Sequence, residues 1–219
     1  MPKISRGWLV SLVILFILIA DQWLKIWVKT HMSLHESIRI TDWFYIFFIE
    51  NNGMAFGLEL FDKLFLTLFR IIAVGFLVWY IVRISSQANV RTAYLITLAI
   101  IVAGATGNII DCLFYGLSFD HSYGQVATLF PNGGGYAGLF YGKVVDMFYF
   151  PLIDTVWPSW VPIVGNQSLV FFRPVFNVAD ASISVGIVMI MLFFRKDLAE
   201  TKVKNKNVDC IDEEISEKQ

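Results

Sequence analysis

The sequence is poor in charged residues, histidine and cysteine. Charged residues make up 16% of the 219 residues, whereas hydrophobic residues reach 57% and the mean hydropathy is +0.63; an average soluble domain is about 25% charged. Two cysteines, Cys112 and Cys210, are too few for a disulfide framework or a thiolate metal cluster. A net charge of −1 lacks the basic excess of nucleic-acid-binding proteins. An ordinary soluble enzyme and a disordered chain are both excluded, which leaves an integral membrane protein.

Four apolar runs are long enough to cross a bilayer, which takes roughly 20 helical residues. They cover about residues 7–28, 64–82, 92–110 and 175–194. We therefore predict a membrane all-α fold with four transmembrane helices. The first run follows Lys3 and Arg6, but no small-residue cleavage site comes after it. We expect a retained helix there rather than a secretory signal peptide.

The distribution of lysine and arginine predicts how the chain is oriented. With four spans, both termini and the short link 83–91 lie on one side. That side carries ten of these residues, against five in the long loops 29–62 and 111–174. We expect cytoplasmic termini and extracytoplasmic long loops. Alternation in 37–41 and an aromatic, β-branched stretch in 43–49 predict a small extracytoplasmic β-sheet, with irregular outer loops around it.

All four runs fall within residues 1–196, and no internal repeat divides them. We predict a single four-helix membrane domain. Residues 197–219 are polar, mixed in charge and rich in lysine and glutamate. Such a terminus is expected to be a flexible cytoplasmic tail.

Four aspartates are predicted to lie at one depth, near the outer interface. Asp21 and Asp111 lie at the outer ends of the first and third runs, and Asp180 lies near the outer start of the fourth. Asp146 lies in the loop that leads to the fourth run. A charge in hydrocarbon is costly and is usually retained for pairing or for chemistry. We therefore expect a functional site at this depth.

Five polar residues in or directly beside these runs also have structural interpretations. Asp21 and Lys25 are four residues apart, so they can pair on one helix face and serve a structural or gate-lining role. Asn108 and Asp111 can tie helix ends together by hydrogen bonds. Arg70 either extends to the interface or provides a counter-charge for the acids, and both interpretations stay open.

Asp146 and Asp180 are harder to explain structurally. Asp146 is flanked by apolar residues, and Asp180 lies at the start of an apolar helix. Two carboxylates in a medium of low dielectric constant tend to share one proton, and such a pair drives aspartic proteolysis. A Ser-His-Asp triad is implausible, because the chain has only three histidines and lacks the G-x-S-x-G motif. The zinc motif H-E-x-x-H is also missing.

Five motifs in order along the chain resemble those of the lipoprotein signal peptidases, the type II signal peptidase family of membrane aspartic proteases. They are D-Q-x-x-K at 21–25, N-x-G-x-A-F at 51–56, G-A-x-G-N-x-x-D at 104–111, G-x-V-V-D at 142–146 and F-N-x-A-D-x-x-I at 176–183. One such motif would be weak support, whereas five in the same order are specific.

The resemblance implies a role for each motif residue. The catalytic pair would be Asp146 and Asp180. Asn51 and Gly53 would bind the substrate backbone near the scissile bond. Support for the two aspartates through hydrogen bonds would come from Asn108, Asp111 and Asn177.

The resemblance also implies a substrate and a location. The substrate would be a prolipoprotein carrying diacylglycerol on a cysteine, cleaved on the N-terminal side of that cysteine. The enzyme would lie in the bacterial cytoplasmic (inner) membrane among its lipids, with the active site near the outer leaflet. Globomycin-type cyclic peptides would inhibit it. No cofactor, metal or nucleic acid is implied.

The chain departs from the family pattern at two places. Cys112 stands where the family usually has an arginine after the G-N-x-x-D aspartate. The segments at about 117–141 and 151–173 are longer than usual, and they are candidates for a lid or for a surface that contacts partner proteins.

Three alternatives would also place acids within a membrane, and the sequence argues against each of them. A transporter or proton channel would need acids at several depths, whereas these are predicted at one. A phosphotransferase that holds Mg²⁺ would need acids three or four residues apart on a cytoplasmic helix face, which the chain lacks. An inactive member of the protease family would be expected to have lost an aspartate, and both are present.

Overall fold

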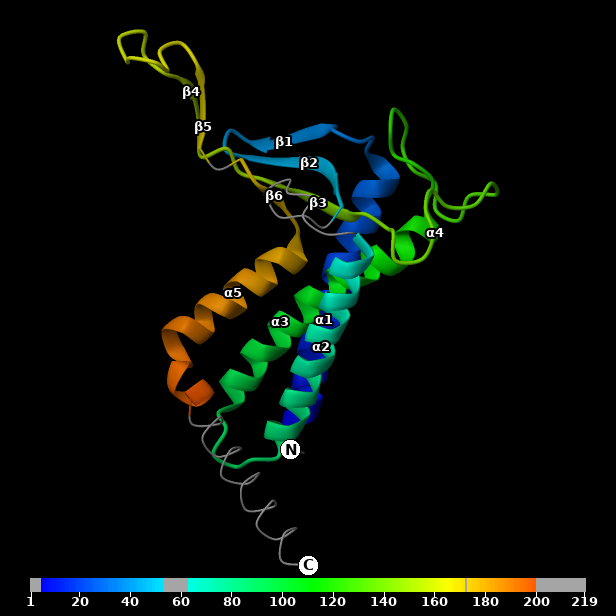
Figure 1. Ribbon diagram of the computed structural model, residues 1–219, viewed down its shortest axis with the longest axis vertical. Helices are drawn as coiled ribbons and strands as arrows, with labels where there is room; N and C mark the ends of the chain where they lie inside the picture. The colour runs from blue at the N-terminus through cyan, green and yellow to red at the C-terminus, as the bar shows by residue number, and fades with distance from the viewer. Residues whose placement is uncertain (1–4, 53–62, 172, 200–219) are drawn as a thin grey trace, which may run out of the picture. The chain divides into compact units, whose positions relative to one another are not determined.

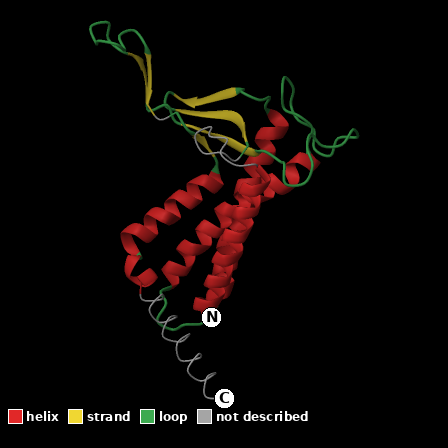
Figure 2. Ribbon diagram, in the orientation of Figure 1, coloured by secondary structure: helices red, strands yellow, loops and turns green. Residues whose placement is uncertain are grey.

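The computed structural model describes residues 5–52, 63–171 and 173–199. It contains apolar helices and short antiparallel strands (Figures 1 and 2). In chain order the elements are α1 (Arg6–His31), β1 (Ser37–Thr41), β2 (Phe44–Asn51), α2 (Lys63–Ser85), α3 (Thr92–Ile110), the π-helical turn η1 (Asp111–Tyr115), α4 (Gly116–Ser118), β3 (Val144–Tyr149), β4 (Ile153–Val156), β5 (Ser168–Phe171), β6 (Val175–Phe176) and α5 (Val178–Phe193).

Three helical segments in the described part of the chain are long and apolar enough to cross a membrane. They are Arg6–His31, Lys63–Ser85 and Thr92–Ser118. Large apolar side chains on them are exposed, such as Phe16 at 74% and Ile72 at 71%, as expected of surfaces that face lipid. The fourth, α5, has 16 residues, fewer than the roughly 20 that a span needs. The count of four spans therefore stays a prediction.

Three elements begin or end away from the approximate boundaries predicted from the sequence. The fourth run was predicted from 175, but Val175 and Phe176 form β6, which pairs with β3. Hydropathy alone cannot distinguish a short apolar strand from the start of a helix. The outer loops were predicted from 29 and 111, but α1 continues to His31 and helical structure continues to Ser118. Lysine and aspartate at these places are paired inside the protein, so their charges do not end the helices.

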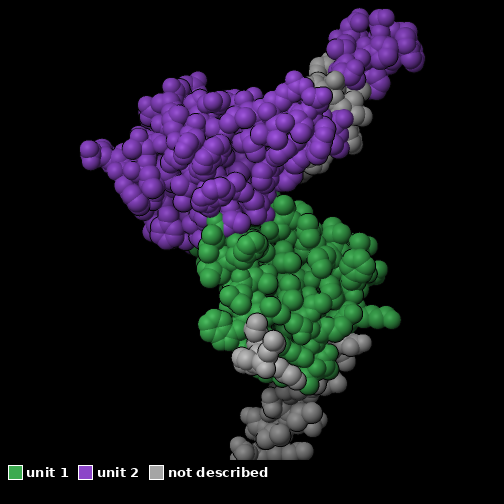
Figure 3. All heavy atoms as spheres, turned by 180° about the vertical axis from the view of Figure 1, so that it is seen from behind, with its two compact units in different colours: residues 1–19, 70–106, 179–219 green, residues 20–69, 107–178 purple. Residues whose placement is uncertain are grey.

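The chain forms two compact units, coloured in Figure 3. Unit 1 comprises residues 1–19, 70–106 and 179–219, and unit 2 comprises residues 20–69 and 107–178. The core of unit 1 includes Tyr94, Leu95 and Leu98. Close helix contact in this unit depends on glycine, because a Cβ on Gly104 would lie 2.4 Å from the carbonyl oxygen of Ala179.

Unit 2 contains a four-stranded antiparallel sheet in the order β1-β2-β3-β6. The small sheet predicted around residues 37–49 is therefore confirmed. It is extended by β3, from the second long loop, and by β6, from the predicted start of the fourth run. Asp146 lies in β3 opposite Ile49 of β2. Strands β4 and β5 form a separate two-stranded sheet, and the segment that joins them exposes Trp160 and Ile163.

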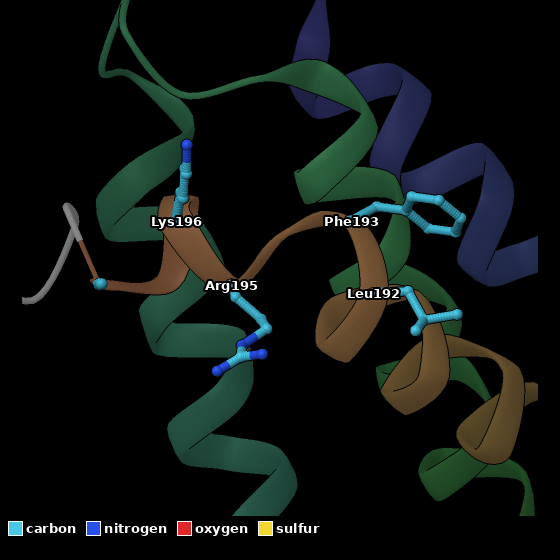
Figure 4. Close-up of a pocket in the computed structure, with 5 residues that line it drawn as sticks. Leu192, Phe193, Arg195 and Lys196 are labelled. Carbon is cyan, nitrogen blue, oxygen red and sulfur yellow. The ribbon is translucent and has the colours of Figure 1, made fainter.

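A hollow in unit 1 lies at the C-terminal end of α5 (Figure 4). Leu192, Phe193, Arg195, Lys196 and Ala199 line it. None of these belongs to the motifs that predicted a site. The expected tail begins near this point, and residues 200–219 lie outside the described residues.

Candidate active site

Lys25 is the centre of a buried network in unit 2. Its Nζ atom lies 2.9 Å from Asp21 Oδ2, 2.8 Å from Asp111 Oδ2 and 2.9 Å from Asn108 Oδ1. The predicted pairing of Asp21 with Lys25 is confirmed, and it follows from their spacing of one helix turn on α1. An ammonium group has three hydrogens to donate, so these acceptors match its full capacity.

Gln22 and Tyr115 orient the two acids, and sequence reasoning assigned neither a role. Gln22 Nε2 donates to Asp111 Oδ1 at 2.9 Å and to Asp21 Oδ2 at 3.1 Å. The hydroxyl of Tyr115, on the π-helical turn, donates to Gln22 Oε1 at 3.1 Å. The sequence did offer one indication of a role for Gln22. It lies beside Asp21 within an apolar run, and a buried amide needs polar partners.

Asp111 connects this network to the strand that carries Asp146. The backbone N–H of Val145 donates to Asp111 Oδ2 at 3.3 Å. The chain also passes very close to the π-helical turn, where a Cβ on Gly142 would lie 2.1 Å from the carbonyl oxygen of Asp111. The N–H of Gly142 donates to the carbonyl oxygen of Cys112 at 2.9 Å. Cys112, at the family's arginine position, is buried.

Asp146 is held by two amide side chains, one on each carboxylate oxygen. Asn177 Nδ2 donates to Oδ1 at 2.7 Å, and Asn51 Nδ2 donates to Oδ2 at 3.3 Å. Asn177 Nδ2 also lies 3.2 Å from the carbonyl oxygen of Val145 and 3.3 Å from Asn108 Oδ1. Asp146 is only 3% exposed. Amide donors favour the ionised carboxylate, whereas burial opposes it.

Several of the predicted site residues lie in unit 2. The structure brings together Asp21, Lys25, Asn108 and Asp111, and through Asn108 and Val145 it links them to Asn51, Asp146 and Asn177. Asp180 lies in the first turn of α5 and is partly buried. Arg70 lies in α2 and is also partly buried. Gly53 lies outside the described residues.

The described part of the chain has no group of three or more histidine, cysteine or acidic residues that could hold a metal ion. The polar groups of the network are carboxylates, amides and one ammonium, with a phenol at its edge. Such groups can hold a carboxylate at a set position and transfer protons.

Comparison of the sequence with protein-family models identifies the family of this chain. The family model described as Signal peptidase (SPase) II matches residues 13–195. The chain belongs to the signal peptidase II family. The match extends over every residue in which a site was predicted, from Asp21 to Asp180. The family is one of peptidases, and membership favours a hydrolase over a transporter or a phosphotransferase.

Individual relatives agree with the family match. A lipoprotein signal peptidase of Porphyromonas gingivalis (strain ATCC 33277) is 48% identical over 199 residues, which cover 91% of this chain and 88% of that protein. A lipoprotein signal peptidase of Amoebophilus asiaticus is 32% identical over 220 residues, covering 97% of this chain and 89% of the relative.

Two solved structures, each described as a bacterial membrane enzyme studied by the in meso method, share the fold of this signal peptidase II family member. The one at 2.3 Å resolution has a TM-score of 0.61 at 23% identity, covering 91% of this chain and 95% of its own. The one at 1.9 Å has a TM-score of 0.58 at 23% identity, covering 88% and 96%. At this level of identity the likeness is one of fold.

One further set of charges escaped sequence reasoning. Glu50, the residue before Asn51, is buried with Lys29 and is contacted by Lys143. Burial by itself would raise the pKa of the Glu50 carboxyl, but Lys29 and Lys143 lower that pKa below its ordinary value of 4.5. Glu50 is therefore ionised at neutral pH. A glutamate inside an aromatic strand was the only available signal.

Proposed function

We propose that this chain is an aspartic endopeptidase of the bacterial cytoplasmic (inner) membrane. It removes the signal peptide from diacylglyceryl-modified prolipoproteins by cleaving on the N-terminal side of the lipidated cysteine. The observation that carries the proposal is the buried Asp146 carboxylate, which has one amide donor on each oxygen. One of those donors, Asn177, directly precedes α5, whose first turn carries Asp180.

The proposed chemistry uses Asp146 and Asp180 as a pair that shares one proton. The ionised member takes a proton from water as the water oxygen attacks the carbonyl carbon of the scissile bond. The protonated member donates its proton to the carbonyl oxygen, which forms a tetrahedral diol. Collapse of the diol breaks the C–N bond. One diol hydroxyl returns its proton to the aspartate that protonated the carbonyl oxygen, and the leaving amine takes up the proton that came from water. The signal peptide leaves with a new carboxyl group.

The other site residues have supporting roles in this proposal. Asn51 and Asn177 keep the Asp146 carboxylate at one orientation. Lys25 pairs with both Asp21 and Asp111, and Asp111 holds the backbone of β3 beside Asp146. Precise placement of reacting groups lowers a barrier by several kcal/mol in favourable cases, so these contacts bear on rate as well as on stability.

The remaining roles follow the family pattern. Asn51 and Gly53 contact the substrate backbone, and Arg70 provides either an interfacial anchor or a counter-charge. Globomycin-type cyclic peptides bind at the same place as the substrate.

The proposed arrangement is one four-helix protease domain over residues 1–196. Both termini are cytoplasmic, and the site lies near the outer leaflet.

The test is cleavage of a lipidated prolipoprotein by purified variants in detergent. Asp146→Asn and Asp180→Asn are each expected to reduce cleavage to background while the protein still purifies as a folded species. Asp42→Asn is a matched control, because the Asp42 side chain is 88% exposed. A wild-type rate in either active-site variant would remove that aspartate from the mechanism.

A further inference from the structure

A second buried charge cluster in unit 2 consists of Lys29, Glu50, Ser122 and Lys143. Lys29 Nζ lies 2.5 Å from Glu50 Oε1, and Lys143 Nζ lies 3.0 Å from Glu50 Oε2. Ser122 Oγ donates to Glu50 Oε1 at 2.9 Å and accepts from Lys29 Nζ at 2.9 Å. The side chain of Lys29 is 1% exposed and that of Glu50 is 4% exposed. The proposed mechanism uses none of these groups.

The long segment 117–141 covers this cluster. Lys29 Nζ lies 5.3 Å from the ring centroid of Phe119 and 5.0 Å from that of Tyr136, both within cation–π range. Ser122, which bonds to both members of the ion pair, comes from the same segment. The N–H of Ala127 donates to the carbonyl oxygen of Lys29 at 3.2 Å. Residues of this segment therefore pack over the Lys29–Glu50 ion pair and help to bury it.

Glu50 lies at the end of the strand pair that carries Asp146. Glu50 pairs with Val145 across β2 and β3, and the next residue on β2, Asn51, donates to Asp146. Lys143 immediately precedes β3. The bond from Lys143 to Glu50 therefore crosses the two strands at the end where Asn51 meets Asp146.

The backbone register is not uniform along these strands. It shifts between Ile46 and Ile49 of β2, so the pairing on one side of the irregularity does not set the pairing on the other. A slip by one residue turns each side chain to the opposite face of a sheet. Such a slip at this end would turn Asn51 away from Asp146. A side-chain tie near Asn51 can prevent that slip.

Successive lysines on α1 hold both strands. Lys25 pairs with Asp111, which accepts the N–H of Val145 on β3. Lys29, one helix turn later, pairs with Glu50 on β2. Buried ion pairs contribute little net stability compared with apolar packing, but they can specify one arrangement. This is the property expected of ion pairs that hold β2 and β3 in one relative position.

We propose that Glu50 is a positioning residue for the active site. Through Lys29 and Lys143 it sets the β2–β3 register so that Asn51 meets Asp146, and the segment 117–141 serves to bury this tie. The inference rests on the proposed role of Asp146 in catalysis. It assigns a local packing role to a segment that the sequence suggested as a lid or a partner surface.

The experiment compares kcat, KM and hydrogen exchange in two double variants. Lys29→Met with Glu50→Gln removes both members of the buried pair and leaves the Lys143 ammonium, whose side chain is 37% exposed, to be solvated. We expect kcat to fall at least about tenfold, since a 1 Å misplacement of reacting groups can cost roughly 100-fold. KM should stay within about twofold, as for a loss confined to the chemical step. Amide exchange should become faster in the peptide that contains β2.

The matched control removes an exposed ion pair from the same sheet. Arg39 and Asp42 form that pair, with side chains 62% and 88% exposed, and Arg39→Gln with Asp42→Asn is expected to leave kcat and exchange unchanged. If the Lys29/Glu50 variant does not fold, Lys143→Met decides, because Lys143 is partly exposed. Its kcat should fall about threefold or more, with KM unchanged, for a smaller misplacement.

Three results would overturn the inference: a wild-type kcat in the folded Lys29/Glu50 variant, a wild-type kcat in Lys143→Met when that double variant fails to fold, or a loss that lies wholly in KM. Asp146→Asn is measured in parallel as a reference. If Asp146→Asn is inactive and the tie variants behave as wild type, only the positioning role fails. If Asp146→Asn is active, the proposed catalytic function fails instead.

Discussion

Asn177 Nδ2 lies 2.7 Å from Asp146 Oδ1, and the two residues are 31 positions apart in the sequence. Asn177 lies between β6 and α5, so one residue both holds the buried carboxylate and leads into the helix that carries Asp180. Because β6 pairs with β3, the position of Asn177 depends on the same sheet that positions Asp146. The contact thus links the sheet to the proposed catalytic residues.

Asn177→Ala is expected to lower kcat about 10- to 100-fold, because a hydrogen bond to a charged group contributes roughly 1.5–3 kcal/mol. The variant should remain folded, since it introduces no new charge. The measurement is steady-state cleavage of a lipidated prolipoprotein, with the exposed Asn132→Ala as control. An unchanged kcat would show that the orientation of Asp146 does not depend on the hydrogen bond from Asn177.

Lys25→Met is expected to lower the free energy of unfolding by about 3–5 kcal/mol, because it leaves Asp21 and Asp111 buried without their cation. Thermal unfolding in detergent measures the effect. Adding Asp21→Asn and Asp111→Asn should recover part of the loss. Arg39→Met, at an exposed position, is the control, and an equal loss in both variants would contradict a specific role for the buried network.

Glu50 predicts a pH dependence of stability. In the folded protein the pKa of the Glu50 carboxyl is below its ordinary value of 4.5. As the pH falls, this carboxyl is therefore protonated in the unfolded chain before it is protonated in the folded protein. The stabilisation is complete above 4.5 and is lost as the pH falls through the lowered pKa. Unfolding temperatures measured across this range should fall less steeply for Glu50→Gln than for the wild type. Parallel curves would contradict the prediction.

Chelators are expected to leave activity unchanged, because the proposed aspartate pair activates water without a metal. Cleavage is measured before and after dialysis against EDTA. Loss of activity that a divalent ion restores would favour a metal held by the same acids.

Gly104→Ala is expected to destabilise the protein by about 1–3 kcal/mol, because overpacking forces neighbouring groups to move. The added Cβ would lie 2.4 Å from the carbonyl oxygen of Ala179. Gly75→Ala in α2 is the matched control, since its Cβ would meet nothing within 4 Å. Thermal unfolding compares the two variants, and equal stability would show that α3 and α5 can separate without cost.

The sheet residues show where sequence reasoning reached its limit. The alternation in 37–41 predicted β1, and the aromatic stretch predicted β2, because a strand pattern is local. The helical start predicted at 175 was wrong because Val175 and Phe176 are apolar in a strand and in a helix alike. Their pairing with Tyr149 and Phe148 depends on a distant strand, which local hydropathy does not report.

Two kinds of information therefore specify this protein. The sequence by itself determined the apolar runs, the family and the Asp21–Lys25 pair, since hydropathy, motif order and a spacing of one helix turn are all readable along a chain. Only the tertiary structure decided that Asn51, 95 residues away, holds Asp146, and that Glu50 forms ion pairs with Lys29 and Lys143. Those contacts follow from strand register and burial, which exist only once distant segments pack together.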